Sequence, residues 1–133
     1  EELAKVAKKY KIMVLSDEIY AELDFSGKYK SIAHYYPEGT IISSGLSKWC
    51  GAGGWRLGYF VMSESLNQLR DSLKVLASET FTSVSAPIQY AAIAAYDNDH
   101  SEHINNSKNI LKAVGEYVYN NLKSNPAAAQ AKD

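Results

Sequence analysis

The chain has 133 residues and a net charge of −1, and 46% of its residues are hydrophobic, which is enough for one domain with a buried core. The near-neutral charge excludes a basic surface for nucleic acid, and no apolar run approaches the ~18 residues that a membrane span needs. The single cysteine, Cys50, excludes an internal disulfide and favours a reducing, cytoplasmic location.

The first ten residues have the pattern of a helix. Leu3, Val6, Ala7 and Tyr10 recur at the spacing of one helical face, so we expect this face to pack on the rest of the protein. The first residue is Glu rather than Met, and no capping residue precedes the helix. We therefore expect the chain to start inside a longer protein, with any targeting signal lying before it.

Three short apolar runs, residues 11–15, 40–44 and 57–62, predict three strands. Continuous apolar runs of this length are typical of strands that are buried on both faces. Residues 24–39, between the first two runs, are rich in turn-forming residues and predict a loop.

The remainder is predicted to be helical. One helix starts at Ser63 and another at Ser85, where Pro87 is tolerated in the first turn. Asp99 and Glu102 resemble a capping box before a long polar helix. Residues 125–130 have no apolar period and predict a frayed or artificial end. Because strands alternate with helices, the expected fold class is α/β with a largely parallel sheet.

The stretch SGLSKWCGAGGWRLGY, residues 44–59, carries the strongest chemical signal. Lys48 precedes a cluster of glycines and Arg56 follows it, which suggests a bound anion. A Walker loop has its lysine after the glycines, at the start of a helix, whereas Lys48 comes before them and a strand follows. The dinucleotide pattern also fails, because its third glycine would fall at Arg56.

A different interpretation explains the stretch better than a nucleotide-binding loop does: the amine of Lys48 is itself the reagent. A lysine after a buried strand can form a Schiff base with an aldehyde cofactor, and Arg56 could fold back to hold a phosphate with its planar guanidinium. Pyridoxal 5'-phosphate (PLP) has both groups, and it also needs a carboxylate beside its ring nitrogen.

Asp17, directly after the first predicted strand, can supply that carboxylate. Ligands of open α/β sheets bind at the carboxyl ends of the strands, where both Asp17 and Lys48 are expected. Tyr20 follows three residues later and could direct its hydroxyl at the phenolic oxygen of the cofactor. Asp17 could also be a simple turn residue, and Tyr20 could simply pack, as most tyrosines do.

These residues carry a resemblance to a known family. Asp17-x-x-Tyr20, Ser47-Lys48-x7-Arg56 and the helix start at residues 84–92 resemble the class I/II aminotransferases of PLP fold-type I, over residues 1 to about 122. The resemblance implies a three-layer large domain with a mostly parallel sheet flanked by helices. It also implies that Asp17 holds the pyridine nitrogen, Tyr20 the phenolic oxygen, Lys48 the aldehyde and Arg56 the phosphate.

The activity that the resemblance implies is transfer of an amino group between an amino acid and a 2-oxo acid, in a homodimer, with Lys48 moving the proton at the substrate α-carbon. Many members carry a serine three residues before the lysine, where its hydroxyl helps to bind phosphate. This sequence has Gly45 there, and Ser44 or Ser47 could compensate.

Parts of such an enzyme are not found in this chain. The only arginine besides Arg56 is Arg70, which is expected in solvent and not on the substrate carboxylate. We therefore expect residues 1–99 to be part of the PLP-binding large domain and residues 100–133 to be a long helix leading toward a small domain. The chain alone is expected to be inactive.

Several alternatives stay open at this point. The cofactor residues would also suit another fold-type I enzyme, such as a β-lyase or an aminocyclopropane-carboxylate synthase, and a non-catalytic chain could use the fold for dimerisation or regulation. Arg56 could merely pair with a carboxylate. His100 and His103 have a metal-like spacing, but a solvated helix start is the favoured interpretation and no metal site is expected. Trp49 and Cys50 are given no task.

Overall fold

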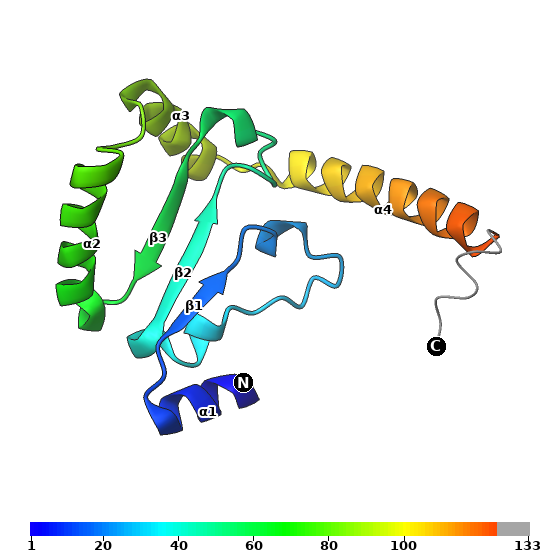
Figure 1. The fold of residues 1–133 in the computed structure, drawn as a ribbon. Helices are drawn as coiled ribbons and strands as arrows, with labels where there is room; N and C mark the ends of the chain where they lie inside the picture. The colour runs from blue at the N-terminus through cyan, green and yellow to red at the C-terminus, as the bar shows by residue number, and fades with distance from the viewer. Residues whose placement is uncertain (125–133) are drawn as a thin grey trace. The chain divides into compact units, whose positions relative to one another are not determined.

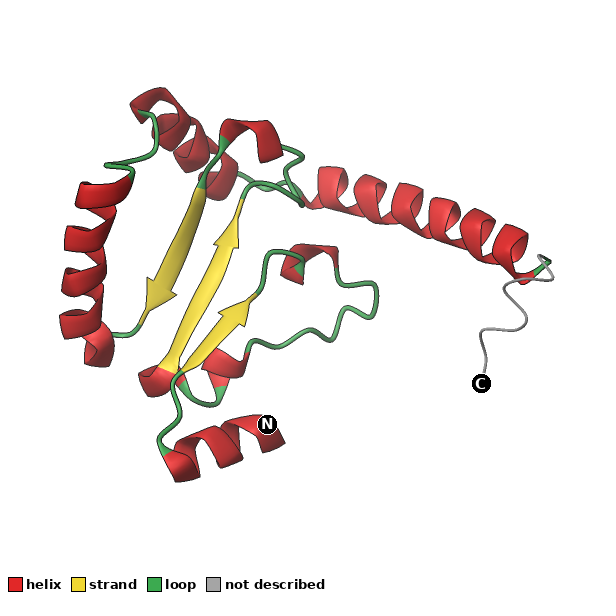
Figure 2. Cartoon of the chain, viewed as in Figure 1, coloured by secondary structure: helices red, strands yellow, loops and turns green. Residues whose placement is uncertain are grey.

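The computed structural model describes residues 1–124. Its strands are β1 (Val14–Asp17), β2 (Thr40–Gly45) and β3 (Gly58–Met62), and its α-helices are α1 (Glu2–Tyr10), α2 (Asn67–Thr80), α3 (Ala86–Asp97) and α4 (Ser101–Lys123). Figures 1 and 2 show these elements. The frayed end predicted at residues 125–130 lies outside the described residues.

The chain divides into two compact units, one of residues 1–99 and one that begins at His100. The first unit contains the sheet with α1, α2 and α3, and the second contains α4. The assignment of these two units to a large domain and to a helix leading toward a small domain stays a prediction.

The α/β class is confirmed, with β2 at the centre of a three-stranded sheet of order β1-β2-β3. β1 pairs with β2 in parallel, from Val14↔Thr40 to Asp17↔Ser43. β2 pairs with β3 in antiparallel register, ending at Gly45↔Gly58. The described sheet is therefore mixed, because the short connection between β2 and β3 returns directly, whereas a parallel pair needs a longer crossover.

The prediction of strands buried on both faces holds best for β2. Thr40 and Ile41 are buried there, whereas Leu15 of β1 is 63% exposed and Phe60 of β3 is 54% exposed. β2 has a neighbouring strand on each side, whereas β1 and β3 are the outer strands of the described sheet.

Helix α1 packs through its smallest side chains. Ala4 and Ala7 are buried against Tyr36, whereas Leu3, on the stripe predicted to pack, is 76% exposed. The predicted face is therefore wrong except for Ala7. The two alanines let the backbone of α1 come close to the Tyr36 ring, and a larger side chain would not fit as near.

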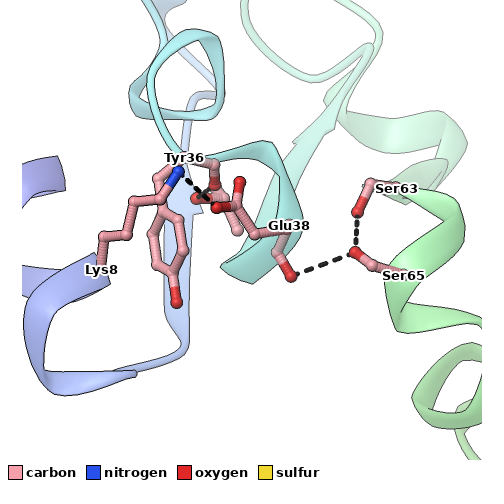
Figure 3. A network of polar contacts seen from close by, with 6 residues as sticks. Lys8, Tyr36, Glu38, Ser63 and Ser65 are labelled. Carbon is pink, nitrogen blue, oxygen red and sulfur yellow. Dashed lines mark hydrogen bonds and ion pairs between the residues drawn. The ribbon is translucent and has the colours of Figure 1, made fainter.

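A polar network links α1 to the turns that flank the sheet (Figure 3). The Lys8 ammonium lies 2.6 Å from the Glu38 carboxylate. The Ser65 hydroxyl donates to the Glu38 carbonyl oxygen at 3.1 Å and lies 2.6 Å from the Ser63 hydroxyl. The hydrogen bond from Lys8 holds the pKa of the Glu38 carboxyl below its usual value. All four side chains are polar and on the surface, so the network fixes geometry more than it adds stability.

The helices after β3 begin slightly later than predicted. Residues 64–66 form a 3₁₀ turn, and α2 follows it at Asn67. Leu69, Leu73 and Ala77, on one face of α2, are half-buried as expected of an amphipathic helix, whereas Leu76 on the same face is 59% exposed. Helix α3 has Pro87 in its first turn, also as predicted.

Arg70 is exposed and lies 3.7 Å from the Asp71 carboxylate.

Helix α4 begins at Ser101 with His100 as its N-cap residue, and the His100 side chain makes no cap hydrogen bond. The predicted capping residue, Asp99, therefore stands one position before the cap. Among the described helices, none is long and apolar enough to cross a bilayer. Within residues 1–124, no three His, Cys, Asp or Glu side chains are grouped so that they could hold a metal ion.

Candidate active site

The predicted site residues lie around one edge of the sheet. β1 ends at Asp17, and β2 ends at Gly45, three residues before Lys48. β3 runs in the opposite direction, so its first residue, Gly58, lies at that same edge, two residues after Arg56. Figure 1 shows the ends of β1 and β2 and the start of β3 at this edge. The antiparallel β3 thus brings Arg56 to the edge where the parallel pair presents Asp17 and Lys48.

Lys48 and Tyr20 are in direct contact. The Lys48 ammonium nitrogen lies 5.3 Å from the centroid of the Tyr20 ring, within the range of a cation–π interaction. Tyr20 lies in the turn after β1, and both side chains are exposed. The structure therefore joins the first predicted motif, Asp17-x-x-Tyr20, to the second, Ser47-Lys48.

Asp17 is the last residue of β1, and its backbone is fixed by the sheet. It pairs with Ser43 of β2, and the next residue, Glu18, donates its N–H to the Ser43 carbonyl oxygen at 2.8 Å. The Asp17 carboxylate is exposed and accepts a 3.4 Å bond from the Ile19 N–H. That bond is long and weak, so the turn role of Asp17 does not prevent its carboxylate from binding a ligand.

The connection between β2 and β3, residues 46–57, is a closed loop with its own interior. The Leu46 N–H donates to the Leu57 carbonyl oxygen at 3.4 Å and joins the two ends, while the Ala52 N–H donates to the Leu46 carbonyl oxygen at 3.1 Å. Leu46 is 1% exposed and Trp49 is 6% exposed. Buried apolar side chains and backbone bonds therefore set the shape of the loop that carries Lys48 and Arg56.

Arg56 has a left-handed backbone conformation, with φ of 57°, which costs a non-glycine residue about 1–2 kcal/mol. Its guanidinium donates to the Gly53 carbonyl oxygen at 2.6 Å, which uses one of its five N–H donors. Within residues 1–124 it forms no ion pair with a carboxylate. The loop thus holds an exposed guanidinium beside the sheet edge, suited to an anion.

Gly45 is required by the close approach of β3. A Cβ atom at Gly45 would lie 2.6 Å from the Leu57 carbonyl oxygen and 3.0 Å from the Gly58 Cα. A serine at this position would displace the backbone of the loop. The departure from the family pattern at Gly45 therefore has a steric reason. Ser44 and Ser47, on either side of it, are both half-buried.

Trp49, the residue after Lys48, belongs to a group of three aromatic rings. The ring centroids of Trp49 and Tyr96 are 5.7 Å apart, as are those of Tyr59 and Tyr96. The Tyr96 hydroxyl donates to the Tyr59 hydroxyl at 2.9 Å. Burial raises the pKa of Tyr96 and the bond to Tyr59 adds to that, while a hydrogen bond with Trp49 acts in the opposite direction. Sequence reasoning gave Trp49 no role, because its partner lies on a distant helix and leaves no local pattern.

Glu18 was also missed by the sequence analysis. The Ser31 hydroxyl donates to the Glu18 carboxylate at 2.6 Å. Burial, with a hydrogen bond to Glu18 and its negative charge, raises the pKa of Tyr29 to about 12. Glu18 therefore ties the later part of the β1–β2 connection to the end of β1, next to Asp17.

The chain is similar in sequence and in fold to known aminotransferases. The family model described as aminotransferase class I and II matches residues 1–132. An aspartate aminotransferase of Bacillus sp. (strain YM-2) is 33% identical over 131 residues, covering 95% of this chain and 32% of that protein. The solved structure of an alanine aminotransferase from Pyrococcus furiosus has a TM-score of 0.80 and 32% identity, covering 94% of this chain and 32% of that one.

A structure of a Thermus thermophilus aspartate aminotransferase variant matches with a TM-score of 0.82 at 23% identity, covering 92% of this chain and 32% of that chain, and so supports the fold alone. The chain therefore spans about a third of the length of these proteins. The similar proteins include aspartate and alanine aminotransferases.

Proposed function

The chain belongs to the class I and II aminotransferase family, and from this premise we propose that the intact protein transfers an amino group between an amino acid and a 2-oxo acid, with PLP as cofactor. The observation that carries the proposal is the contact between the Lys48 ammonium and the Tyr20 ring, at the sheet edge that also presents Asp17 and Arg56.

The side chains at this edge match the cofactor group by group. PLP supplies an aldehyde that reacts with amines and a ring that accepts electrons. Lys48 offers the amine for the aldehyde, and Asp17 offers the carboxylate that keeps a proton on the ring nitrogen. The Arg56 guanidinium, with the Ser47 hydroxyl, suits the phosphate. Tyr20 offers a hydroxyl for the phenolic oxygen.

Lys48 is proposed to have a second task, as the base that moves the proton at the substrate α-carbon. An amine on a four-carbon stem can reach both the aldehyde and the adjacent carbon. The Tyr20 ring, 5.3 Å from the Lys48 nitrogen, would keep this side chain near the cofactor whenever the two are not bonded to each other. Proton transfer by a positioned side chain contributes about 10²- to 10⁴-fold to a rate.

The substrate carboxylate is proposed to be held by residues outside this chain. Arg70 lies on α2 beside Asp71 and has no place at the sheet edge. We therefore propose that residues 1–133 alone are inactive. The intact protein is further proposed to be a homodimer that acts in the cytoplasm.

Product analysis tests this function. The intact protein, supplied with PLP, is incubated with aspartate or alanine and a 2-oxo acid. The proposal predicts a new amino acid and a new 2-oxo acid in equal amounts. A lyase would release ammonia and pyruvate instead, and the absence of any PLP-dependent product would favour a non-catalytic role.

A matched pair of variants links this activity to the site. Lys48→Ala is expected to lower the transamination rate about 10³-fold, since it removes both the amine and the base. Lys28→Ala removes an exposed lysine of the β1–β2 connection and is expected to leave the rate unchanged. Equal rates for both variants would refute the assignment of Lys48.

A further inference from the structure

We propose that Tyr96 of α3 is a positioning residue for Lys48 and acts through Trp49. The Tyr96 ring packs against the Trp49 side chain, and the hydroxyl of Tyr59 on β3 fixes the Tyr96 hydroxyl. This inference rests on the proposed function of Lys48 and adds three positioning residues to it, none of which is assigned to cofactor binding. It assigns to α3 the task of fixing where the reactive amine lies.

Lys48 and its neighbour Trp49 differ in burial. Lys48 is exposed, whereas Trp49 is 6% exposed. A lysine has a long, flexible side chain, so the position of its amine depends on how firmly its own backbone is held. Consecutive Cα atoms are about 3.8 Å apart, and a buried Trp49 therefore restricts the Lys48 backbone directly. The Lys48 carbonyl also accepts the Gly51 N–H at 3.2 Å, which closes the turn.

Trp49 packs against the Tyr96 ring. Its ring centroid lies 5.7 Å from that of Tyr96, with the planes tilted by 59°, which is within the range of a favourable aromatic pair. Tyr96 in turn lies edge-on to Tyr59 at 5.7 Å and 81°. The three rings thus form one continuous group, which we call the aromatic brace, made of Trp49, Tyr59 and Tyr96.

A hydrogen bond between two hydroxyls fixes the aromatic brace. The Tyr96 hydroxyl donates to the Tyr59 hydroxyl at 2.9 Å, and Tyr59 lies on β3 in register with Ser44 of β2. Both tyrosines are carried by regular elements, which position side chains more accurately than loops do. Although Tyr96 is 48% exposed, this directional bond links α3 to the same sheet edge from which the Lys48 loop emerges.

A conservative variant separates positioning from packing. Tyr96→Phe keeps the ring contact with Trp49 and removes only the hydroxyl. In the intact protein with PLP, we expect kcat to fall about fivefold, the factor that one neutral hydrogen bond is worth, with KM for the amino acid unchanged. The visible circular dichroism of the bound cofactor should change as well, because the Lys48 amine shifts.

The Tyr59 hydroxyl provides an internal check, since the two hydroxyls share one hydrogen bond. Tyr59→Phe should produce part of the effect of Tyr96→Phe, because the Tyr96 hydroxyl also has a hydrogen bond with Trp49, and the double variant should lose no more than Tyr96→Phe alone. Tyr90→Phe is the matched control: Tyr90 is also on α3 and is 74% exposed, so its variant should behave as wild type.

A readout without the cofactor makes the test independent of activity. The PLP-free protein is labelled with acetic anhydride, and the rates at Lys48 and Lys28 are compared by peptide mapping. Tyr96→Phe should change the acetylation rate of Lys48 about threefold to fivefold, the factor that one hydrogen bond is worth. The acetylation rate of Lys28 should stay unchanged.

Three outcomes are decisive. Wild-type values of kcat, dichroism and Lys48 labelling in Tyr96→Phe would overturn the inference. So would a lower melting temperature with those three values unchanged, because that result would indicate packing alone. If wild-type protein formed no PLP-dependent product while Tyr96→Phe still altered Lys48 labelling, the proposed function would fail and the physical link between Tyr96 and Lys48 would stand.

Discussion

The two connections that meet at the sheet edge hold their residues by different means. The β2–β3 connection, residues 46–57, has buried side chains of its own, Leu46 and Trp49, and its ends are joined by a backbone hydrogen bond. The β1–β2 connection, residues 18–39, is longer, and residues 24–30 at its centre are largely exposed. The β1–β2 connection is held in shape by the carboxylates of Glu18 and Asp24, which accept hydrogen bonds.

Two carboxylates organise the longer connection. The Asp24 carboxylate accepts hydrogen bonds from the Ser26 hydroxyl at 2.7 Å and from the Lys28 and Tyr29 N–H groups at 3.1 and 3.2 Å. The bond from Ser26, with help from those backbone groups, holds the pKa of Asp24 below its usual value. Glu18 performs the same task for Ser31.

The difference indicates how each half of the site should respond to change. Lys48 and Arg56 share a loop whose shape depends on packing, so they should be disturbed together by a cavity or a steric clash. Asp17 and Tyr20 border a connection whose shape depends on charge, so they should respond to pH and to the loss of single hydroxyls. Four pairs of variants test this contrast, in order of decreasing expected effect.

Truncation of the buried leucine should be the most damaging change to the short connection. Leu46 is 1% exposed, so Leu46→Ala is expected to cost about 3 kcal/mol of unfolding free energy in the intact protein, measured by urea denaturation. Leu57→Ala, at the half-buried other end of the same loop, should cost clearly less. Equal losses would mean that the interior of the loop does not set its stability.

A methyl group at Gly45 tests the close approach of the two strands. Because its Cβ would lie 2.6 Å from the Leu57 carbonyl oxygen, Gly45→Ala is expected to cost about 1–3 kcal/mol and to lower activity by moving Lys48 and Arg56. At Gly58, its partner in the register, a Cβ would meet only the Ser44 carbonyl oxygen, at 3.4 Å. Gly58→Ala should therefore be nearly neutral, and a larger loss at Gly58 than at Gly45 would contradict the geometry.

In the long connection, removal of a single hydroxyl should have a smaller effect. Ser31→Ala removes both the 2.6 Å donor to the Glu18 carboxylate and the acceptor of the Ala33 N–H at 3.0 Å, and is expected to cost about 1 kcal/mol. Ser26→Ala removes an exposed hydroxyl that bonds to Asp24, and it should cost less, since water can replace it. Calorimetric unfolding of the two variants measures the difference, and a greater loss for Ser26→Ala would count against Glu18 as the anchor.

The smallest expected effect is the response of the long connection to alkaline pH. The pKa of Tyr29 is raised to about 12, mainly by burial and then by Glu18, so the unfolded chain loses this proton first as pH rises above about 10. Stability present below pH 10 is therefore lost between about pH 10 and 12. With Tyr29 46% exposed, solvent screening limits the loss to about 1 kcal/mol or less. Unfolding midpoints across this range should fall less steeply for Tyr29→Phe than for Tyr90→Phe.

Local patterns were sufficient to predict most elements of the fold. Strand β2 was expected at residues 40–44 and runs from Thr40 to Gly45, and α3 was expected from Ser85 and begins at Ala86. Apolar runs and a proline in a first helical turn are properties of a few adjacent residues, so they are readable without the fold. The antiparallel direction of β3 was missed, because alternation of strands and helices says nothing of how a short loop returns.

The site was predicted as far as its residues lie in compact motifs. The sequence placed Asp17 and Lys48 at the carboxyl ends of two strands, with Tyr20 and Arg56 following at a set spacing, and the described sheet brings these strand ends to one edge. Contacts between distant segments could not be read in this way. The Tyr96 partner of Trp49 and the Ser31 partner of Glu18 depend on how the chain folds back.

The most direct test of the central claim is to trap the cofactor on the enzyme. The intact protein is incubated with PLP, reduced with borohydride and mapped by peptide mass spectrometry. We expect a reduced pyridoxyl group on Lys48, at the edge of the sheet beside Tyr20, and none at that peptide in Lys48→Ala. A modified lysine elsewhere in place of Lys48, or no modification at all, would contradict it.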